Sequence, residues 1–309
     1  MEGKSLFEKS QSLVHIYQNT SDGYLLFYTV KDRLVFFALL NLVARKYGIR
    51  ILGVCLMPDH FHLLIAHVPI EIQSAFVAEL TQRFSRLRNE WYHDSGNLFN
   101  HSYGYALKIG RKKMKTAASY LYNNPVEKAL CTKAEEYQWN FLAYARNDYP
   151  FSERIPLRYA SRPLRRTIEY VTYIGKASLP LSYAPLDSIT EKLKPDELRM
   201  STDYIIQTFN TIDYDALIGL YKGYKEMLLA FESNTGSEYD IKETITKGSD
   251  RAYTYCANLL LRSGKWHDLR EILSLPESTR RRLGKELMAN TEVTRRQVAK
   301  FLKIGRAHV

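Results

Sequence analysis

The chain has 309 residues, of which 45% are hydrophobic, so it carries enough apolar material to bury more than one core. Its 44 lysines and arginines outnumber 33 aspartates and glutamates, and the resulting charge of +11 favours a polyanionic partner such as nucleic acid. No apolar stretch approaches the roughly 20 residues that cross a bilayer, and three widely spaced cysteines argue against a disulfide framework. We therefore expect a soluble, cytoplasmic protein rather than a membrane or exported one.

The first elements along the chain are predicted to be two strands followed by a long helix. The short β-prone runs at residues 13–17 and 24–28 flank the turn-rich segment QNTSDG, which predicts a hairpin. Asp32 is expected to be the N-cap of a helix over residues 32–47, because a long apolar stretch follows it and a glycine ends it.

Strand and helix patterns continue to alternate through the first half of the chain. Residues 49–56 and 60–66 are two apolar strands, and apolar side chains at helical spacing predict a second long helix over residues 72–91. Residues 102–109 alternate like a strand. The next segment, KKMKTAASYLYNN, predicts a helix that stops at Pro125, because the residue before a proline disfavours helical backbone angles.

The chain is predicted to divide into three parts. Residues 1–147 form the domain of interleaved strands and helices, residues 148–162 are rich in proline and polar side chains and predict a linker, and residues 163–309 have mostly helical patterns. We therefore expect an α+β fold with a central antiparallel sheet and flanking helices, followed by an all-α C-terminal region.

The C-terminal region is predicted to end in a truncated helix-turn-helix. A basic helical segment, a polar turn at residues 290–294 and a second helical segment, TRRQVAKFL, look like the start of that motif, in which the helix after the turn enters the major groove of DNA. The last residues, IGRAHV, match what one reading frame of a widely used sequencing adapter encodes before a stop codon. We therefore expect the natural sequence to be interrupted near Lys303.

His60 and His62 are the first candidate site residues. They lie two apart on a predicted strand, whose period of two directs both imidazoles to one face and Phe61 to the other. Two histidines on one face can hold a divalent ion such as Mg²⁺ or Mn²⁺ if a third side chain joins them. A bare pair of this kind is more often two ordinary strand histidines, so the pair alone does not establish a site.

The surrounding sequence is more specific, because CLMPDHFHLLI is followed about sixty residues later by AASYLYNNPVEKAL. These strings resemble the HUH superfamily of single-tyrosine transposases, and most closely its REP-associated and insertion-sequence 200-like branch. The family's histidine string matches residues 57–64, and its tyrosine followed four positions later by an Asn-Pro pair matches Tyr120, Asn124 and Pro125. The resemblance covers residues 12–147 and implies a ferredoxin-like or RRM-like core with the histidine strand at its centre.

The resemblance implies a metal-dependent DNA nuclease and strand transferase. Tyr120 would be the nucleophile, and Mg²⁺ or Mn²⁺ would be held by His60, His62 and Asn124. Positions four apart share a helix face, so Tyr120 and Asn124 can point toward one ion. A phenol, with a pKa of about 10, needs help to attack a phosphodiester, and the ion would polarise the scissile phosphate. Attack would leave a 5′-phosphotyrosine and a free 3′-OH, and a second 3′-OH could reverse the reaction without a nucleotide cofactor.

Basic residues near the predicted site are candidate DNA contacts, although such runs are more often solvated faces. They precede the tyrosine helix or lie on the second long helix: Arg111, Lys112, Lys113, Lys115, Arg83, Arg86 and Arg88. Two features depart from the family pattern. Asp59 stands where asparagine is commoner, and the loop after the first strands lacks the family's arginine-glycine-asparagine run, so we assign that loop no role in reading DNA.

The leading interpretation is a transposase that nicks and rejoins single-stranded or hairpin DNA and is associated with the nucleoid when bound. One alternative is a domesticated DNA-binding regulator with the same fold and no transposition, which a nicking assay would distinguish. Another is an RNA-binding module that stacks bases on an aromatic-rich sheet, which competition between RNA and DNA would reveal. The sequence leaves open whether the chain acts as a monomer or a homodimer, which DNA sequence it cuts and which metal it prefers.

Overall fold

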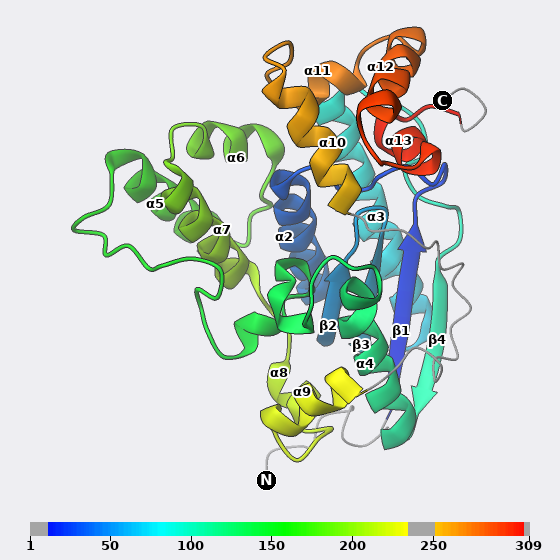
Figure 1. Cartoon of the computed structure of the whole chain (residues 1–309). Helices are drawn as coiled ribbons and strands as arrows, with labels where there is room; N and C mark the ends of the chain where they lie inside the picture. Colours follow the sequence, from blue (N-terminus) through cyan, green and yellow to red (C-terminus); the bar gives the residue numbers. More distant parts are fainter. Residues whose placement is uncertain (1–11, 234–250, 306–309) are drawn as a thin grey trace.

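A four-stranded antiparallel sheet lies at the centre of the protein, which is seen here as a computed structural model that describes residues 12–233 and 251–305 (Figure 1). The strand order is β2-β3-β1-β4, so β3 lies inside the sheet. The strands are β1 (Ser12–Asn19), β2 (Ile51–Leu56), β3 (His60–Ala66) and β4 (Gly104–Ile109). The predicted α+β fold is confirmed, and so is the central position of the histidine strand.

Helices cover both faces of this sheet. Because side chains alternate along a strand, Phe61, Leu63 and Ile65 of β3 enter the large apolar core with α2 and α3. Leu64 of the same strand packs in a second apolar cluster with α4 on the opposite face. The covering helices are α2 (Val30–Lys46), α3 (Ile70–Tyr92) and α4 (Arg111–Glu127).

The predicted hairpin of residues 13–17 and 24–28 is wrong. β1 pairs with β3 and β4, and residues 24–28 contain no strand. The backbone N–H groups of Leu26 and Phe27 instead donate to the carbonyl oxygen of Pro58, at 2.7 and 3.0 Å. This β-prone segment therefore holds the turn between β2 and β3 rather than forming an edge of the sheet.

The first helix begins at Val30 because Thr29, and not Asp32, is its N-cap. The Thr29 hydroxyl accepts a hydrogen bond from the Asp32 N–H, and the Asp32 carboxylate accepts one from the Thr29 N–H at 2.7 Å, which completes a capping box. The same buried carboxylate accepts from the hydroxyl of Tyr92 on α3, at 3.0 Å, and from that of Tyr183 at the start of α6 (Tyr183–Thr190), at 2.8 Å. Asp32 thus joins three helices.

α4 continues past Pro125, where the sequence predicts its end. Proline removes one backbone donor and crowds the preceding turn, so a helix that contains it needs support from other parts of the chain. The side chain of Asn123 supplies such support by donating to the carbonyl oxygen of Phe231 on α9 (Tyr224–Ser233), at 2.6 Å. Contact with α9 therefore outweighs the local preference of the residue before proline.

The described elements after residue 160 are helices, as predicted for the C-terminal region. The group α5 to α7 lies beside α2, the pair α8 and α9 lies near β2 and α4, and the group α10 to α13 lies at the end of the sheet where β1 finishes and β3 starts (Figure 1). These helices are α5 (Arg162–Lys176), α6 (Tyr183–Thr190), α7 (Pro195–Phe209), α8 (Tyr214–Ile218), α9 (Tyr224–Ser233), α10 (Arg251–Arg262), α11 (Leu269–Leu273), α12 (Glu277–Asn290) and α13 (Arg295–Leu302). The 3₁₀ helices η1 (Ala134–Glu136), η2 (Gln138–Asn140) and η3 (Leu142–Ala145) precede them.

One apolar core extends across the predicted linker at residues 148–162. It includes Phe36 on α2 and Ile205 on α7. The division into a domain of residues 1–147 and a helical domain of residues 163–309 stays a prediction.

Among the described residues, no helix combines the length and apolar composition that crossing a bilayer requires.

The C-terminal helices form a small apolar cluster of their own. Leu287 of α12 and Val298 of α13 are buried in it, and Leu25 from the loop after β1 joins them. The helix-turn-helix stays a prediction. Residues 306–309, the last four of the suspected adapter-derived sequence, lie outside the described residues.

We predict that Asp32→Ala lowers the free energy of unfolding by about 3 kcal/mol, because two buried tyrosine hydroxyls and the N-cap N–H groups lose their common acceptor. Urea denaturation followed by circular dichroism measures this change. Asp148→Ala, at an exposed position, is the control and should change stability by less than about 0.5 kcal/mol. Equal stabilities of the two variants would contradict the role assigned to Asp32.

Candidate active site

His60 and His62 lie on the face of β3 that α4 covers. Register places His62 opposite Tyr17 of β1, while Phe61 enters the core on the other face, as predicted from the alternation. His62 is fully buried and His60 is 8% exposed. The two imidazole rings stand nearly perpendicular, with their centroids 4.8 Å apart.

His62 is held on both sides of its ring. Its Nδ1 lies 3.1 Å from Nε2 of His15 on β1, and its Nε2 lies 3.1 Å from the side-chain amide nitrogen of Asn124 on α4. Burial lowers the pKa of the His62 imidazole well below its usual range, and the positive charge that His60 can carry lowers it further. His62 is therefore neutral at pH 7, which is the form that binds metal ions.

Tyr120 lies beside the histidines, as the sequence predicts. Its ring stands edge-on to the rings of His62 and His15, with both centroid distances at 5.6 Å, and the residue is 5% exposed. Tyr122 points elsewhere, because its hydroxyl donates to the carbonyl oxygen of Leu52 at 3.3 Å. The four-residue spacing on α4 thus brings Tyr120 and Asn124, but not Tyr122, to the histidine face.

Asp59 contacts the ring of His60 at its Nδ1. One carboxylate oxygen lies 2.6 Å from His60 Nδ1, and the other pairs with the ammonium group of Lys300 on α13. Burial works against ionisation of this carboxyl, yet the charges of His60 and Lys300 hold its pKa well below the usual range. Asp59 is therefore a carboxylate at neutral pH.

Two imidazoles and an amide fit the donor set expected for a divalent ion. Because Nδ1 of His60 contacts Asp59, its Nε2 is the nitrogen that would bind a metal. The side-chain oxygen of Asn124 is buried and has no hydrogen-bond partner among the described residues. Such an atom is costly unless a cation or a donor satisfies it. No group of three or more His, Cys, Asp or Glu side chains in the described ranges could hold a metal ion.

Two residues of this site, His15 and Lys300, were not predicted from the sequence. His15 is fully buried and contacts both His62 and Tyr120, and the signal available was a histidine inside the apolar run of the first strand. Lys300 reaches Asp59 from 241 positions along the chain, and no local pattern reveals such a contact.

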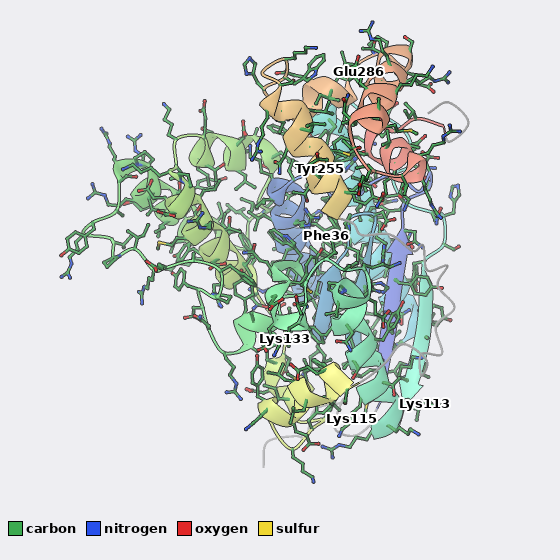
Figure 2. All side chains as sticks on the ribbon, in the orientation of Figure 1. Phe36, Lys113, Lys115, Lys133, Tyr255 and Glu286 are labelled. Carbon is green, nitrogen blue, oxygen red and sulfur yellow. The ribbon has the colours of Figure 1, made fainter. Side chains whose placement is uncertain are left out.

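The basic residues predicted to contact DNA fall into two groups: exposed side chains, and side chains that form hydrogen bonds or ion pairs within the protein. Lys112, Lys113 and Arg86 are exposed. The others make contacts within the protein: Arg111 donates to the carbonyl oxygens of Leu220 and Gly219, Lys115 pairs with Glu226, and Arg83 pairs with Glu79. Lys113 and Lys115 lie in the first turns of α4 (Figure 2). At a rise of about 1.5 Å per residue, they are about 10 and about 8 Å along the helix axis from Tyr120.

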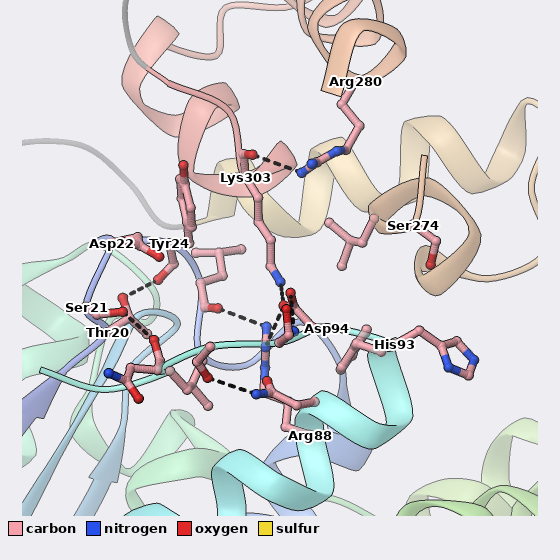
Figure 3. A pocket seen from close by; sticks show the side chains of 18 of the residues that line it. Thr20, Ser21, Asp22, Tyr24, Arg88, His93, Asp94, Ser274, Arg280 and Lys303 are labelled. Carbon is pink, nitrogen blue, oxygen red and sulfur yellow. Dashed lines mark hydrogen bonds and ion pairs between the residues drawn. The ribbon is translucent and has the colours of Figure 1, made fainter. Parts of the chain in front are cut away.

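Arg88 occupies an interior position and does not face a DNA-binding surface. Its guanidinium lies over the rings of Tyr28 and Tyr92, and it stands 3.6 Å from the carboxylate of Asp94. Asp94 also pairs with Lys303, next to a cavity of about 340 Å³ between the end of α3 and the C-terminal helices (Figure 3). This cluster joins the C-terminal helices to the sheet domain.

Comparison with known proteins gives one family and one structure. The sequence model of the family described as "Transposase IS200 like" matches residues 13–124, a range that contains both histidines, Tyr120 and Asn124. The chain is also similar to a solved structure of a REP-associated tyrosine transposase bound to a REP hairpin. That likeness has 14% sequence identity and a TM-score of 0.38, and it covers 52% of this chain and 98% of the other. No curated protein matches the sequence.

We predict that the metal-free protein loses stability as the pH falls below about 6.5, because the unfolded chain then binds a proton at residue 62 that the folded chain resists. A group whose pKa is depressed on folding contributes stability above its unfolded pKa and loses it below. The slope attributable to this residue is at most about 1.4 kcal/mol per pH unit. Urea denaturation in EDTA at pH 7.5, 6.5 and 5.5 measures it. His62→Gln should have a shallower slope, and an unchanged slope would contradict the assignment.

Proposed function

We propose that the chain, whose residues 13–124 belong to the IS200-like transposase family, nicks and rejoins single-stranded or hairpin DNA through a covalent bond to Tyr120. The observation that carries this proposal is the convergence of Tyr120, His62 and Asn124 at one buried point between β3 and α4. A merely structural tyrosine in this protein, such as Tyr122, donates its hydroxyl to a backbone carbonyl and lies apart from the histidines.

In the proposed reaction, the phenol oxygen of Tyr120 attacks the phosphorus of a DNA phosphodiester. A bond forms between that oxygen and phosphorus, and the bond from phosphorus to the 3′ oxygen breaks. The phenol proton leaves to solvent and the departing 3′ oxygen takes up a proton, so that the products are a 5′-phosphotyrosine and a free 3′-OH. Rejoining is the reverse, with a 3′-OH displacing the tyrosine, and it needs no nucleotide cofactor because the phosphotyrosine keeps the energy of the bond.

The residues that would hold Mg²⁺ or Mn²⁺ are His60, His62 and Asn124. When bound, such an ion would neutralise charge on the scissile phosphate and lower the barrier to attack. The chain prepares the ligands by burying His62 in its neutral form and by orienting His60 through Asp59. His15 adds to this by holding the Nδ1 side of the His62 ring.

The protein's charge and surface support DNA as the substrate. The net charge of +11 attracts a phosphate backbone, and Lys112 and Lys113 are exposed at the start of the helix that carries Tyr120. We infer that these two lysines contact the strand on one side of the cut. Arg86 is a further candidate on α3.

Tyr120→Phe should abolish covalent attachment to DNA. The purified protein would be incubated with Mn²⁺ and labelled hairpin oligonucleotides from the flanks of its gene, and a denaturing gel would reveal a protein-DNA adduct. Tyr122→Phe is the matched control, because it removes a tyrosine hydroxyl from the same helix and should still form the adduct. Normal nicking by Tyr120→Phe would exclude the proposed nucleophile. Tight binding by the wild type with no adduct from any hairpin would favour a DNA-binding regulator instead.

Asn124→Ala should raise the Mn²⁺ concentration needed for half-maximal nicking by at least about tenfold, since it removes the amide ligand. Chelation with EDTA should stop nicking by the wild type, and added Mg²⁺ or Mn²⁺ should restore it. Thr116→Ala is the comparison variant, because Thr116 lies on the same helix and its hydroxyl donates to the carbonyl oxygen of Lys112 within that helix. Its Mn²⁺ requirement should equal that of the wild type. Nicking that persists in EDTA would rule out the metal.

A further inference from the structure

The C-terminal helix α13 reaches the histidine strand through one lysine. Lys300 pairs with Oδ2 of Asp59, whose Oδ1 lies 2.6 Å from Nδ1 of His60. The carboxylate thus connects a helix near the end of the chain to the first residue of β3. Figure 1 shows α13 beside the end of the sheet at which β1 finishes. Register pairs the last residue of β1 with the first of β3, so α13 and His60 lie at the same end.

This ion pair differs from an ordinary surface pair in its burial. The Lys300 side chain is 12% exposed and that of Asp59 is 22% exposed. Pairs between fully exposed side chains contribute little, because water screens them and both side chains lose conformational freedom. A largely buried pair is different, since removing one partner leaves the other charge poorly solvated.

The position of Lys300 is itself fixed by packing. Phe301 beside it packs against Tyr28, with ring centroids 6.1 Å apart. Arg280 of α12 donates to the carbonyl oxygens of Leu302 and Lys303, which secures the end of α13. The ammonium group is therefore presented to Asp59 by a helix that is anchored on both the sheet domain and the C-terminal cluster.

We propose that Lys300 is a positioning residue for the candidate metal ligand His60, acting through Asp59. An imidazole that donates its Nδ1 proton to a carboxylate keeps its Nε2 lone pair for a metal and has a fixed ring orientation. Lys300 holds one carboxylate oxygen, and the other is thereby aimed at His60. The inference rests on the proposed function only in naming His60 as a ligand, since the contact itself stands on the geometry.

A consequence is that the C-terminal helices contribute to the site through Lys300. Without Lys300, the Asp59 carboxylate would be free to turn toward water or toward other donors. The His60 ring would then lose its fixed tautomer, and metal affinity would fall. Loss of an outer partner of this kind typically weakens metal binding by about 10–100-fold.

The test compares full-length Lys300→Met, Lys300→Arg and Lys303→Met with the wild type. Mn²⁺ binding in the absence of DNA is measured by electron paramagnetic resonance, and the tautomer of His60 is read from ¹⁵N chemical shifts of its ring. Lys300→Met should weaken Mn²⁺ binding by about tenfold or more and reduce the population of the Nδ1–H tautomer. Lys300→Arg, which keeps the charge, should recover most of the Mn²⁺ affinity and most of the Nδ1–H tautomer population.

Lys303→Met is the control for looser docking of the C-terminal helices. It breaks the pair with Asp94 and leaves the pair between Lys300 and Asp59 in place. Its Mn²⁺ affinity should match that of the wild type. If Lys303→Met and Lys300→Met lose Mn²⁺ affinity equally, docking of the C-terminal helices controls the site rather than the Asp59 carboxylate. That result would overturn the inference.

The outcomes also separate this inference from the proposed function. If the wild type binds Mn²⁺ but never forms a DNA adduct, the nuclease proposal is wrong. The effect of Lys300 on Mn²⁺ binding is still decided in that case, because it is measured without DNA. A wild type that nicks DNA, with Lys300→Met binding Mn²⁺ normally and keeping the His60 tautomer, would defeat only the role of Lys300. A wild type that binds no Mn²⁺ would overturn the role as well.

Discussion

The side chains of β3 alternate between two buried environments, and this alternation fixes the other parts of the site. Phe61, Leu63 and Ile65 belong to the main core, so their burial sets the register of the strand. A slip by one residue would move both histidines into the apolar core beneath α2 and would take Phe61, Leu63 and Ile65 out of it. Burial of these three apolar side chains therefore favours the register in which the histidine pair faces α4.

The second requirement is a helix that presents two residues to that face. Tyr120 and Asn124 lie one turn apart on α4, which packs on the same side of the sheet as the histidines. The end of α4 contains Pro125 and depends on α9 through the amide of Asn123. Segments far along the chain thus maintain the geometry of a site whose main residues all lie before residue 125.

The sequence predicts the local parts of this arrangement well and the long-range parts poorly. The family resemblance singles out His62, Tyr120 and Asn124, and alternation and helical spacing then predict which face of its element each one occupies, because that depends on the period of a single element. His15 could not be assigned, since its contact with His62 depends on the pairing of β1 with β3. The false hairpin has the same origin, because residues 24–28 have strand-like side chains but their backbone donors bond to the turn before β3.

Because Asp59 and Lys300 lie far apart in the sequence, their ion pair can form only late in synthesis of the chain. The two residues are 241 positions apart, and a ribosome that adds roughly 5–20 residues per second needs about 10–50 s to make the chain between them. The strands and the tyrosine helix leave the ribosome long before α13 does. A nascent chain therefore carries both histidines and the tyrosine while Asp59 still lacks its lysine, and the final arrangement of these groups is reached only when synthesis of the last helix is complete.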